Sequence, residues 1–456
     1  MTPDEFRRYG HQVVDWLADY FAHPERHAVL PRVEPGFLAP QLPPSAPERG
    51  EPMEAILADF ARLIVPGLTH WNHPRFFAYF SVTGSPPGVL AEMLAAGLNI
   101  NHMVWKSGPA ATELEQVTTG WLRQWLGLPE EFFGMIHDTA SSSTLHGLAA
   151  AREQADPEAR TLGASRGLVL YTSEQAHSSV EKSAIAIGIG QRNVRKIPVD
   201  ECFRLRPEAL EEAIRADLAQ GLRPGCVVAT VGTTSTTSVD PVPAVAEIAA
   251  RHGLWLHVDA AYGGAAGIVP EYAHYLAGCA RADSLVINPH KWLGAPVDLS
   301  VLFTRRPDVL RRAFALVPEY LRTAEDARAL NYMDYSLPLG RRFRALKLWF
   351  VMRSYGRQGI VEKVRAHIGW AQDLARRIAA HPDYEVCAPV PMSLVCFRRK
   401  GSDEENRALL DRINATGEAF LSHTVLNGRF VLRLAIGNYA TTESDVERCW
   451  ELIQQC

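Results

Sequence analysis

Apolar residues near the start of the chain recur at the three- and four-residue spacing of an amphipathic helix. Val13, Trp16 and Tyr20 follow this spacing, so we predict an N-terminal helix. The next stretch, residues 23–52, is rich in proline and favours an extended arm. An arm without a core of its own must bury its apolar side chains elsewhere, which predicts contact with a second copy of the chain. These side chains are Leu30, Val33, Phe37 and Leu38.

Helix-type patterns alternate with short apolar runs between residues 84 and 350. Strands alternating with helices predict an α/β domain with a mainly parallel sheet, covered on both faces. The predicted helices are 89–98, 111–126, 145–154, 207–218 and 241–252. The predicted strands are 134–136, 168–172, 193–197, 226–231, 254–259, 284–288 and 299–303.

The C-terminal part has a different pattern. After a long helix near 344–355, two helices and two strands predict a smaller α+β domain. The chain therefore divides into an N-terminal helical and extended segment, a large α/β domain and a small C-terminal domain. Their predicted bounds are 1–84, 85–350 and 351–456; the tail elements are helices 361–380 and 404–416 and strands 393–398 and 429–436.

Composition removes several classes of function. The 456 residues carry a net charge of −4 with no long basic run, which argues against a nucleic-acid partner. No window reaches the roughly 18 uninterrupted apolar residues of a membrane span, and the charged N-terminus does not read as a signal core. The seven cysteines are scattered, so neither a disulfide framework nor a metal site is expected. A cytoplasmic protein is the simplest expectation.

Two predicted strands end in groups of opposite charge. The run 254–259 ends at Asp259, and Lys291 lies three positions after the run 284–288. Because functional groups in parallel sheets gather at the carboxyl ends of strands, we expect this acid and this amine at one edge. Pyridoxal phosphate (PLP) needs a lysine amine and a carboxylate for its ring nitrogen, so the pattern predicts a PLP site. Taken singly, Lys291 reads as a solvated loop charge and Asp259 as a helix cap.

Three further segments fit a phosphate and a ring at the same edge. His177 follows the strand 168–172 and can stack on a cofactor ring, although a cap for the next helix explains it equally well. Residues 138–144 carry four consecutive hydroxyl side chains where a helix begins, and a helix N-terminus attracts phosphate. The loop 232–238 adds more hydroxyl groups, with an ordinary polar loop as the alternative.

Several motifs in order resemble the PLP-dependent aromatic L-amino acid decarboxylases, the type II decarboxylase group. The likeness runs from HPRFFAYF (73–80) to FVLRLAIG (430–437), so it covers nearly the whole chain. It implies the aspartate aminotransferase type of PLP-dependent transferase fold (fold type I) and a homodimer. The other motifs are SGPAATELE (107–115), HDTASSSTL (137–145), SEQAHSSVEK (173–182), ATVGTTSTT (229–237), HVDAAYGG (257–264), NPHKW (288–292) and PLGRRFRALKLWF (338–350).

The resemblance assigns roles to individual residues. Lys291 looks like the Schiff-base lysine, Asp259 like the partner of the pyridine nitrogen and His177 like the stacking histidine. Tyr320 matches the tyrosine that protonates the substrate carbon, and phenylalanine stands there in relatives that make aldehydes. The remaining cofactor-binding positions implied are Ala140, Ser141, Thr234, Ala261, Asn288 and His290.

The substrate pocket is also implied by the resemblance, with an aromatic L-amino acid as the expected substrate. Gly340 stands where histidine and plant tyrosine decarboxylases carry serine, so it leaves room for a larger ring. Val82 and His102 depart from the family pattern, since threonine and glycine are common at these two positions. The remaining pocket positions implied are Trp71, Tyr79, Phe80 and Met103.

Other functions stay open at this level. An aldehyde synthase or a histidine or glutamate decarboxylase would use the same cofactor, and Tyr320, Gly340 and the aromatic pocket speak against them. A nucleotide-binding oxidoreductase would need a GxGxxG turn, and residues 188–193 lack the third glycine. A scaffold protein without a cofactor is the remaining class, which an absorption spectrum would distinguish.

Overall fold

The computed structural model describes every residue except 164–166, 317–320, 322–324 and 326–327. Contacts group the chain into two compact units. The first unit contains residues 1–81, 376–387 and 396–456, and the second contains 82–375 and 388–395. The three segments predicted from the sequence stay a prediction, but the contacts place the first 81 residues in one unit with most of the C-terminal tail.

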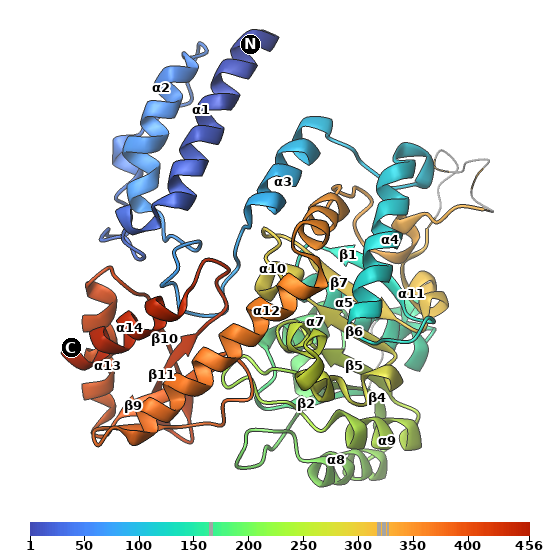
Figure 1. Cartoon of the computed structure of the whole chain (residues 1–456). Coiled ribbons are helices and arrows are strands. Elements are labelled where there is room, and N and C mark those ends of the chain that lie inside the picture. The colour runs from blue at the N-terminus through green and yellow to red at the C-terminus, as the bar shows by residue number, and fades with distance from the viewer. Residues whose placement is uncertain (164–166, 317–320, 322–324, 326–327) are drawn as a thin grey trace. The chain divides into compact units, whose positions relative to one another are not determined.

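The second unit is built on a seven-stranded sheet with the order β1-β7-β6-β5-β4-β2-β3 (Figure 1). The prediction of a mainly parallel sheet is confirmed, because β2, β3, β4, β5 and β6 all pair in parallel. Only β7 runs antiparallel to its neighbours β1 and β6, which the apolar runs could not reveal. The strands are β1 (Phe133–His137), β2 (Leu168–Ser173), β3 (Val194–Ile197), β4 (Arg223–Thr230), β5 (Trp255–Asp259), β6 (Ser284–Ile287) and β7 (Ser300–Thr304).

Helices pack on this sheet. The helix α5 lies against β4, β5, β6 and β7, and α8 and α9 pack against β4. Leu148 of α5 meets Leu170, Val228 and Trp255 in one buried apolar cluster. The helices of this unit are α3 (Pro86–Leu98), α4 (Pro109–Trp125), α5 (Ala140–Ala155), α6 (Ala159–Leu162), α7 (Ser178–Ala186), α8 (Pro207–Ala219), α9 (Val242–His252), α10 (Pro289–Trp292) and α11 (Pro307–Phe314).

A long helix, α12 (Ala345–Ala380), is interrupted at Gly356. There φ is 61° and ψ is 175°, a left-handed conformation that glycine adopts without steric cost. The interruption falls between the two helices predicted at 344–355 and 361–380. Among the described helices, none has a stretch long and apolar enough to cross a membrane.

The first unit combines two N-terminal helices with a four-stranded sheet of order β10-β11-β9-β8. The proline-rich arm contains short 3-10 turns at Pro24–Arg26 and Ala39–Gln41 and is otherwise irregular. The elements are α1 (Pro3–Ala22), α2 (Met53–Asp59), β8 (Tyr384–Val386), β9 (Leu394–Arg399), α13 (Asp403–Ala415), β10 (Ser422–Leu426), β11 (Arg429–Ala435) and α14 (Glu443–Gln455). Of these, α2, β8, β10 and α14 were not predicted.

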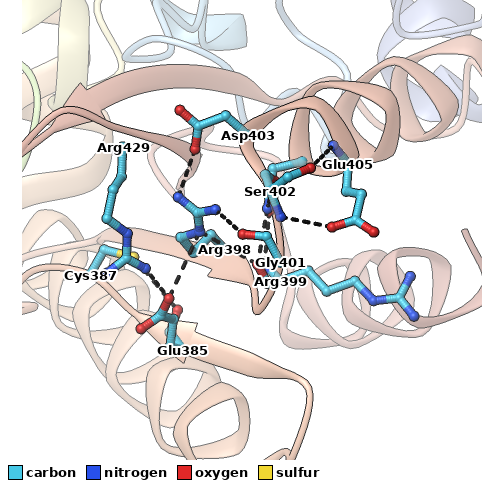
Figure 2. Close-up of polar contacts among 10 residues, drawn as sticks. Glu385, Cys387, Arg398, Arg399, Gly401, Ser402, Asp403, Glu405 and Arg429 are labelled. Atoms are coloured by element: carbon cyan, nitrogen blue, oxygen red, sulfur yellow. Dashed lines mark hydrogen bonds and ion pairs between the residues drawn. The ribbon is translucent and has the colours of Figure 1, made fainter.

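A group of polar contacts fixes the turn from β9 to α13 (Figure 2). Arg398, whose side chain is 4% exposed, donates to Asp403 Oδ1 over 2.8 Å and to the Gly401 carbonyl over 2.6 Å. Ser402 and Glu405 form a capping box at the start of α13. Each of these contacts stabilises the strand-to-helix connection, so this cluster reads as structural.

Candidate active site

The acid and the amine predicted to share a sheet edge do so. Asp259 is the last residue of β5, and its Oδ1 accepts the Ala261 N–H over 3.0 Å. β6 runs parallel to β5, and Lys291 lies in the one-turn helix α10 that follows it. Ala261 and Asn288 join the two strand ends, because the Asn288 N–H donates to the Ala261 carbonyl over 3.1 Å.

Burial changes the pKa of the amine at this sheet edge. Burial lowers the pKa of Lys291 below its ordinary value, and the charge of Asp259 opposes this shift only in part. Asp259 is itself 6% exposed. Lys291 is half-buried, and its lowered pKa leaves a larger fraction of neutral amine, which is the nucleophilic form that attacks a carbonyl.

His177 faces the same two groups. Burial lowers its pKa, the charge of Lys291 lowers it further, and Asp259 raises it. His177 is also the N-cap of α7, and its Nδ1 accepts the Ser179 N–H over 3.1 Å. His177 is therefore a helix cap, as one interpretation of the sequence expected, and it also lies near Lys291 and Asp259, as the cofactor-binding interpretation requires. Since Nδ1 accepts, a neutral ring carries its proton on Nε2.

The helix start proposed as a phosphate seat is present at α5. Ala140 and Ser141 lie in its first turn, where N–H groups lack intrahelical acceptors. Thr139 takes the N-cap position without a side-chain cap bond. Ser143 is occupied elsewhere, because its Oγ lies 2.8 Å from Ser300 Oγ in the interior. Of the hydroxyl run, only its exposed start can face a ligand.

The loop after β4 is stabilised by hydrogen bonds between its own side chains. Thr233 Oγ1 lies 3.0 Å from Thr236 Oγ1, which lies 2.8 Å from Ser238 Oγ. These bonds occupy three of the six hydroxyl groups of the loop, and a fourth, Thr237 Oγ1, donates to the Thr236 carbonyl over 2.6 Å. Thr234 is the exposed residue of this loop, and it is the one that the resemblance selected.

One buried atom near Lys291 tests whether a polar ligand fits here. Asn288 is 3% exposed, and its Oδ1 has no hydrogen-bond partner within the described ranges. An orphaned buried acceptor is costly unless a ligand donor completes it. His290, by contrast, is used by the fold, since its Nδ1 accepts the Leu299 N–H over 2.8 Å. Burial, followed by the charge of Lys291, lowers the pKa of His290 to about 3.

The predicted substrate positions are spread over both units. In the second unit, Gly340 is exposed, and a Cβ added there would meet only Asn101 Nδ2, at 3.9 Å. Val82 is half-buried, and Met103 packs on an apolar cluster containing Val104, Leu321 and Met333. His102 is fully buried.

The other aromatic candidates belong to the first unit. Trp71 stacks on Phe76 with ring centroids 4.3 Å apart, and Phe80 lies under the Arg433 guanidinium. Tyr79 adopts a left-handed φ of 53°, which is strained for an aromatic residue and is typical of functional sites. Tyr320 lies outside the described residues.

Sequence reasoning missed a buried ion pair near the substrate positions. Glu115 and Arg341 approach to 2.6 Å, with side chains 1% and 7% exposed. A glutamate on an otherwise packed face of α4 was the available signal, because a buried carboxylate requires a partner. Within the described ranges, no cluster of His, Cys, Asp and Glu side chains could hold a metal ion.

The whole chain is similar to known proteins. The family model of the pyridoxal-dependent decarboxylase conserved domain matches residues 35–400. The chain is 42% identical to a phenylacetaldehyde synthase of Arabidopsis thaliana, covering all of this chain and 96% of that protein. It is 43% identical to tyrosine decarboxylase 4 of Petroselinum crispum, over 100% and 93% of the two chains. The crystal structure of Oryza sativa TDC with PLP and tryptamine matches with a TM-score of 0.97 at 38% identity, over 100% and 98%.

Proposed function

The chain belongs to the pyridoxal-dependent decarboxylase family, and on that premise we propose that it converts an aromatic L-amino acid into the arylalkylamine and CO₂. Family membership confirms the predicted cofactor, pyridoxal phosphate, and the predicted carboxy-lyase class. The match to a PLP-containing structure over the whole chain confirms the predicted fold type I. The observation that carries the proposal is the position of Lys291, which is half-buried and has a lowered pKa, at the same sheet edge as Asp259.

Each residue of this edge has a proposed task. When bound, pyridoxal phosphate supplies an electron sink for the pair that departing CO₂ leaves behind. Lys291 would hold the cofactor through its amine, since its lowered pKa favours the neutral, nucleophilic form. Asp259 accepts a hydrogen bond from the protonated ring nitrogen and stabilises its positive charge. Its burial strengthens this pairing.

Three other residues complete the site. The first turn of α5, at Ala140 and Ser141, binds the phosphate through its N–H groups and positive end. The Nε2 proton of His177 faces the ring or the substrate carboxylate, because Nδ1 is taken by the helix cap. An apolar pocket around that carboxylate disfavours its charge relative to the transition state, which accelerates loss of CO₂.

Support for an aromatic substrate comes from two sides. The relatives reported above carry tyrosine decarboxylase and phenylacetaldehyde synthase in their names, and the rice structure contains tryptamine. Gly340 leaves open space at a predicted pocket position. We therefore propose that an indole, catechol or phenol ring occupies the space beside Gly340.

An aldehyde synthase is the second candidate, because one relative at 42% identity has that activity in its name. Tyr320 favours the amine, since we assign it the proton that reaches the substrate carbon. The test incubates the PLP-loaded protein with Trp, Tyr, DOPA, Phe and His and measures amine, aldehyde, ammonia and hydrogen peroxide. We expect amine from the wild type and a shift towards aldehyde, ammonia and peroxide in Tyr320→Phe. Aldehyde and peroxide as the main wild-type products would replace the proposal with the synthase.

We propose that the chain acts as a homodimer. On α3, Leu90, Leu94 and Leu98 share one face and are 52%, 50% and 60% exposed. Exposed apolar patches of this kind mark interaction surfaces. Light scattering should give twice the chain mass for the wild type and a smaller mass for Leu94→Lys. A monomeric wild type would contradict the dimer.

We propose a cytoplasmic location. The seven cysteines show no spacing typical of a disulfide framework, which favours a reducing compartment. Cell fractionation with an antibody against the native protein tests this, and recovery of the protein in a secreted fraction would contradict it.

A further inference from the structure

His102 is the residue of the predicted pocket whose environment differs most from that of a pocket wall. It is completely buried, and its Nε2 lies 3.0 Å from Glu115 Oε2. Although burial alone would raise it, the pKa of Glu115 is lowered, because the charge of Arg341 and the contact with His102 favour the carboxylate. The carboxylate can only accept, so His102 donates from Nε2.

Glu115 and Arg341 also hold the end of β1. Glu115 Oε1 accepts the Ile136 N–H over 2.8 Å, and Arg341 Nη2 donates to the Ile136 carbonyl over 3.1 Å. β1 is an edge strand of the sheet, so this ion pair occupies both backbone groups of one edge residue. Four residues further on, α5 begins at the phosphate-seat candidate Ala140.

The segment that carries His102 is bonded to the segment that carries Gly340. Asn101 Oδ1 accepts the Arg341 N–H over 2.8 Å. The Met103 carbonyl accepts the Met333 N–H over 3.2 Å, and Asn331 Oδ1 accepts the Trp105 N–H over 2.8 Å. Three hydrogen bonds therefore join residues 101–105 to residues 331–341, and Met103 and Gly340 lie in these two segments.

We propose that His102 is a positioning residue for substrate and cofactor binding: by completing a buried His102–Glu115–Arg341 cluster, it fixes the two pocket segments to the end of β1. It does not touch the reacting atoms. This inference rests on the proposed function, because Gly340 is assigned to the substrate pocket there and the resemblance implies the same role for Met103. It explains why a bulky histidine can stand at a pocket position: its side chain points into the protein interior, towards Glu115.

The chain provides a matched control. His252 Nε2 lies 3.0 Å from Glu211 Oε1, the same separation as in the buried contact, but it joins α8 and α9. The other ion partners of Glu211 are Arg215 and Arg251, whose side chains are 69% and 58% exposed. His252→Gln therefore alters an equivalent contact without touching the pocket segments or β1.

The experiment compares His102→Ala, His102→Gln and His252→Gln with the wild type in KM, kcat, thermal midpoint and PLP affinity. PLP affinity is measured by titrating the apoprotein and following absorbance. We expect His102→Ala to raise KM for the best aromatic substrate by about tenfold, with kcat changed less, because one hydrogen bond to a charged group is lost. PLP affinity should fall in the same variant. His102→Gln retains a donor and should recover most of both losses, while His252→Gln should match the wild type.

Two results would overturn the positioning role. One is a lower thermal midpoint in His102→Ala with unchanged KM and PLP affinity; the other is His102→Gln behaving like His102→Ala. If His102→Ala does not fold, Asn101→Ala tests the same linkage from an exposed residue. It should raise KM as well, and an unchanged KM contradicts the coupling of the segments. The PLP titration and thermal midpoints do not depend on the substrate, so a wild type inactive on aromatic amino acids would refute the proposed function separately.

Discussion

Glu115→Gln offers a direct measure of what the buried ion cluster contributes to stability. The substitution keeps the size and shape of the side chain but removes its charge. Glu115 accepts hydrogen bonds from Arg341 Nη2 at 2.6 Å, from Ile136 N at 2.8 Å and from His102 Nε2 at 3.0 Å. A glutamine has one acceptor oxygen for these three donors, and the Arg341 guanidinium stays buried without a counter-charge.

Breaking a buried ion pair by removing one partner costs about 3–5 kcal/mol, because the remaining charge is left desolvated. Glutamine keeps part of the hydrogen bonding, so we expect the free energy of unfolding to fall by about 3 kcal/mol, at the lower end of that range. Glu211→Gln is the matched control. Its carboxylate also contacts a histidine at 3.0 Å, but its arginine partners are mostly exposed, so the loss should stay below about 1 kcal/mol.

Guanidinium unfolding of both apoproteins, followed by circular dichroism and tryptophan fluorescence, measures these losses. The pH dependence provides a second check. The pKa of Glu115 is lowered in the folded state, so its contribution is present above the ordinary value of 4.5 and is lost as the pH falls through the folded pKa. The difference between wild type and Glu115→Gln should therefore shrink in acid. Equal losses in the two variants at neutral pH would refute the assignment of a buried, charged Glu115.

Three further predictions concern the site and its surroundings. Lys291→Ala should lose the cofactor absorption above 400 nm and all turnover, while exposed Lys182→Ala keeps both; a yellow, active Lys291→Ala would refute the lysine assignment. Gly263→Ala should lower the free energy of unfolding by about 1–3 kcal/mol, because the added Cβ would lie 2.8 Å from the Val231 carbonyl carbon. An unchanged midpoint of thermal unfolding would contradict this clash and show that the loop can shift to accept the methyl group. Burial lowers the pKa of His257 to about 4, so the stability advantage of wild type over His257→Gln should shrink from pH 6.5 towards 4, and a constant difference would contradict a neutral His257.

The local pattern of the sequence was sufficient for the sheet and its functional edge. All seven strands predicted for the large domain are present, with ends shifted by at most three residues. Asp259 and Lys291 could be paired from sequence alone, because one ends an apolar run, the other lies three positions after the next predicted strand, and parallel strands align their carboxyl ends. The motifs around them are local and contiguous, so the resemblance to the family can be identified from the sequence.

Tertiary structure decided which polar groups are left for a ligand. Ser143 and the hydroxyl groups at Thr233 and Thr236 bond inside the protein, whereas a sequence pattern treats all members of a hydroxyl run alike. The direction of β7 and the addition of β8 and β10 depend on pairing between distant segments, which local periodicity does not contain. His102 shows the same limit. Its partner Glu115 lies 13 residues away along the chain, and Arg341, which pairs with Glu115, lies 226 residues from Glu115. The sequence by itself therefore determined which functional groups lie at the sheet edge of Asp259 and Lys291. Packing determined which polar side chains near that edge remain available to a ligand, because hydrogen-bond partners are set by distance in space.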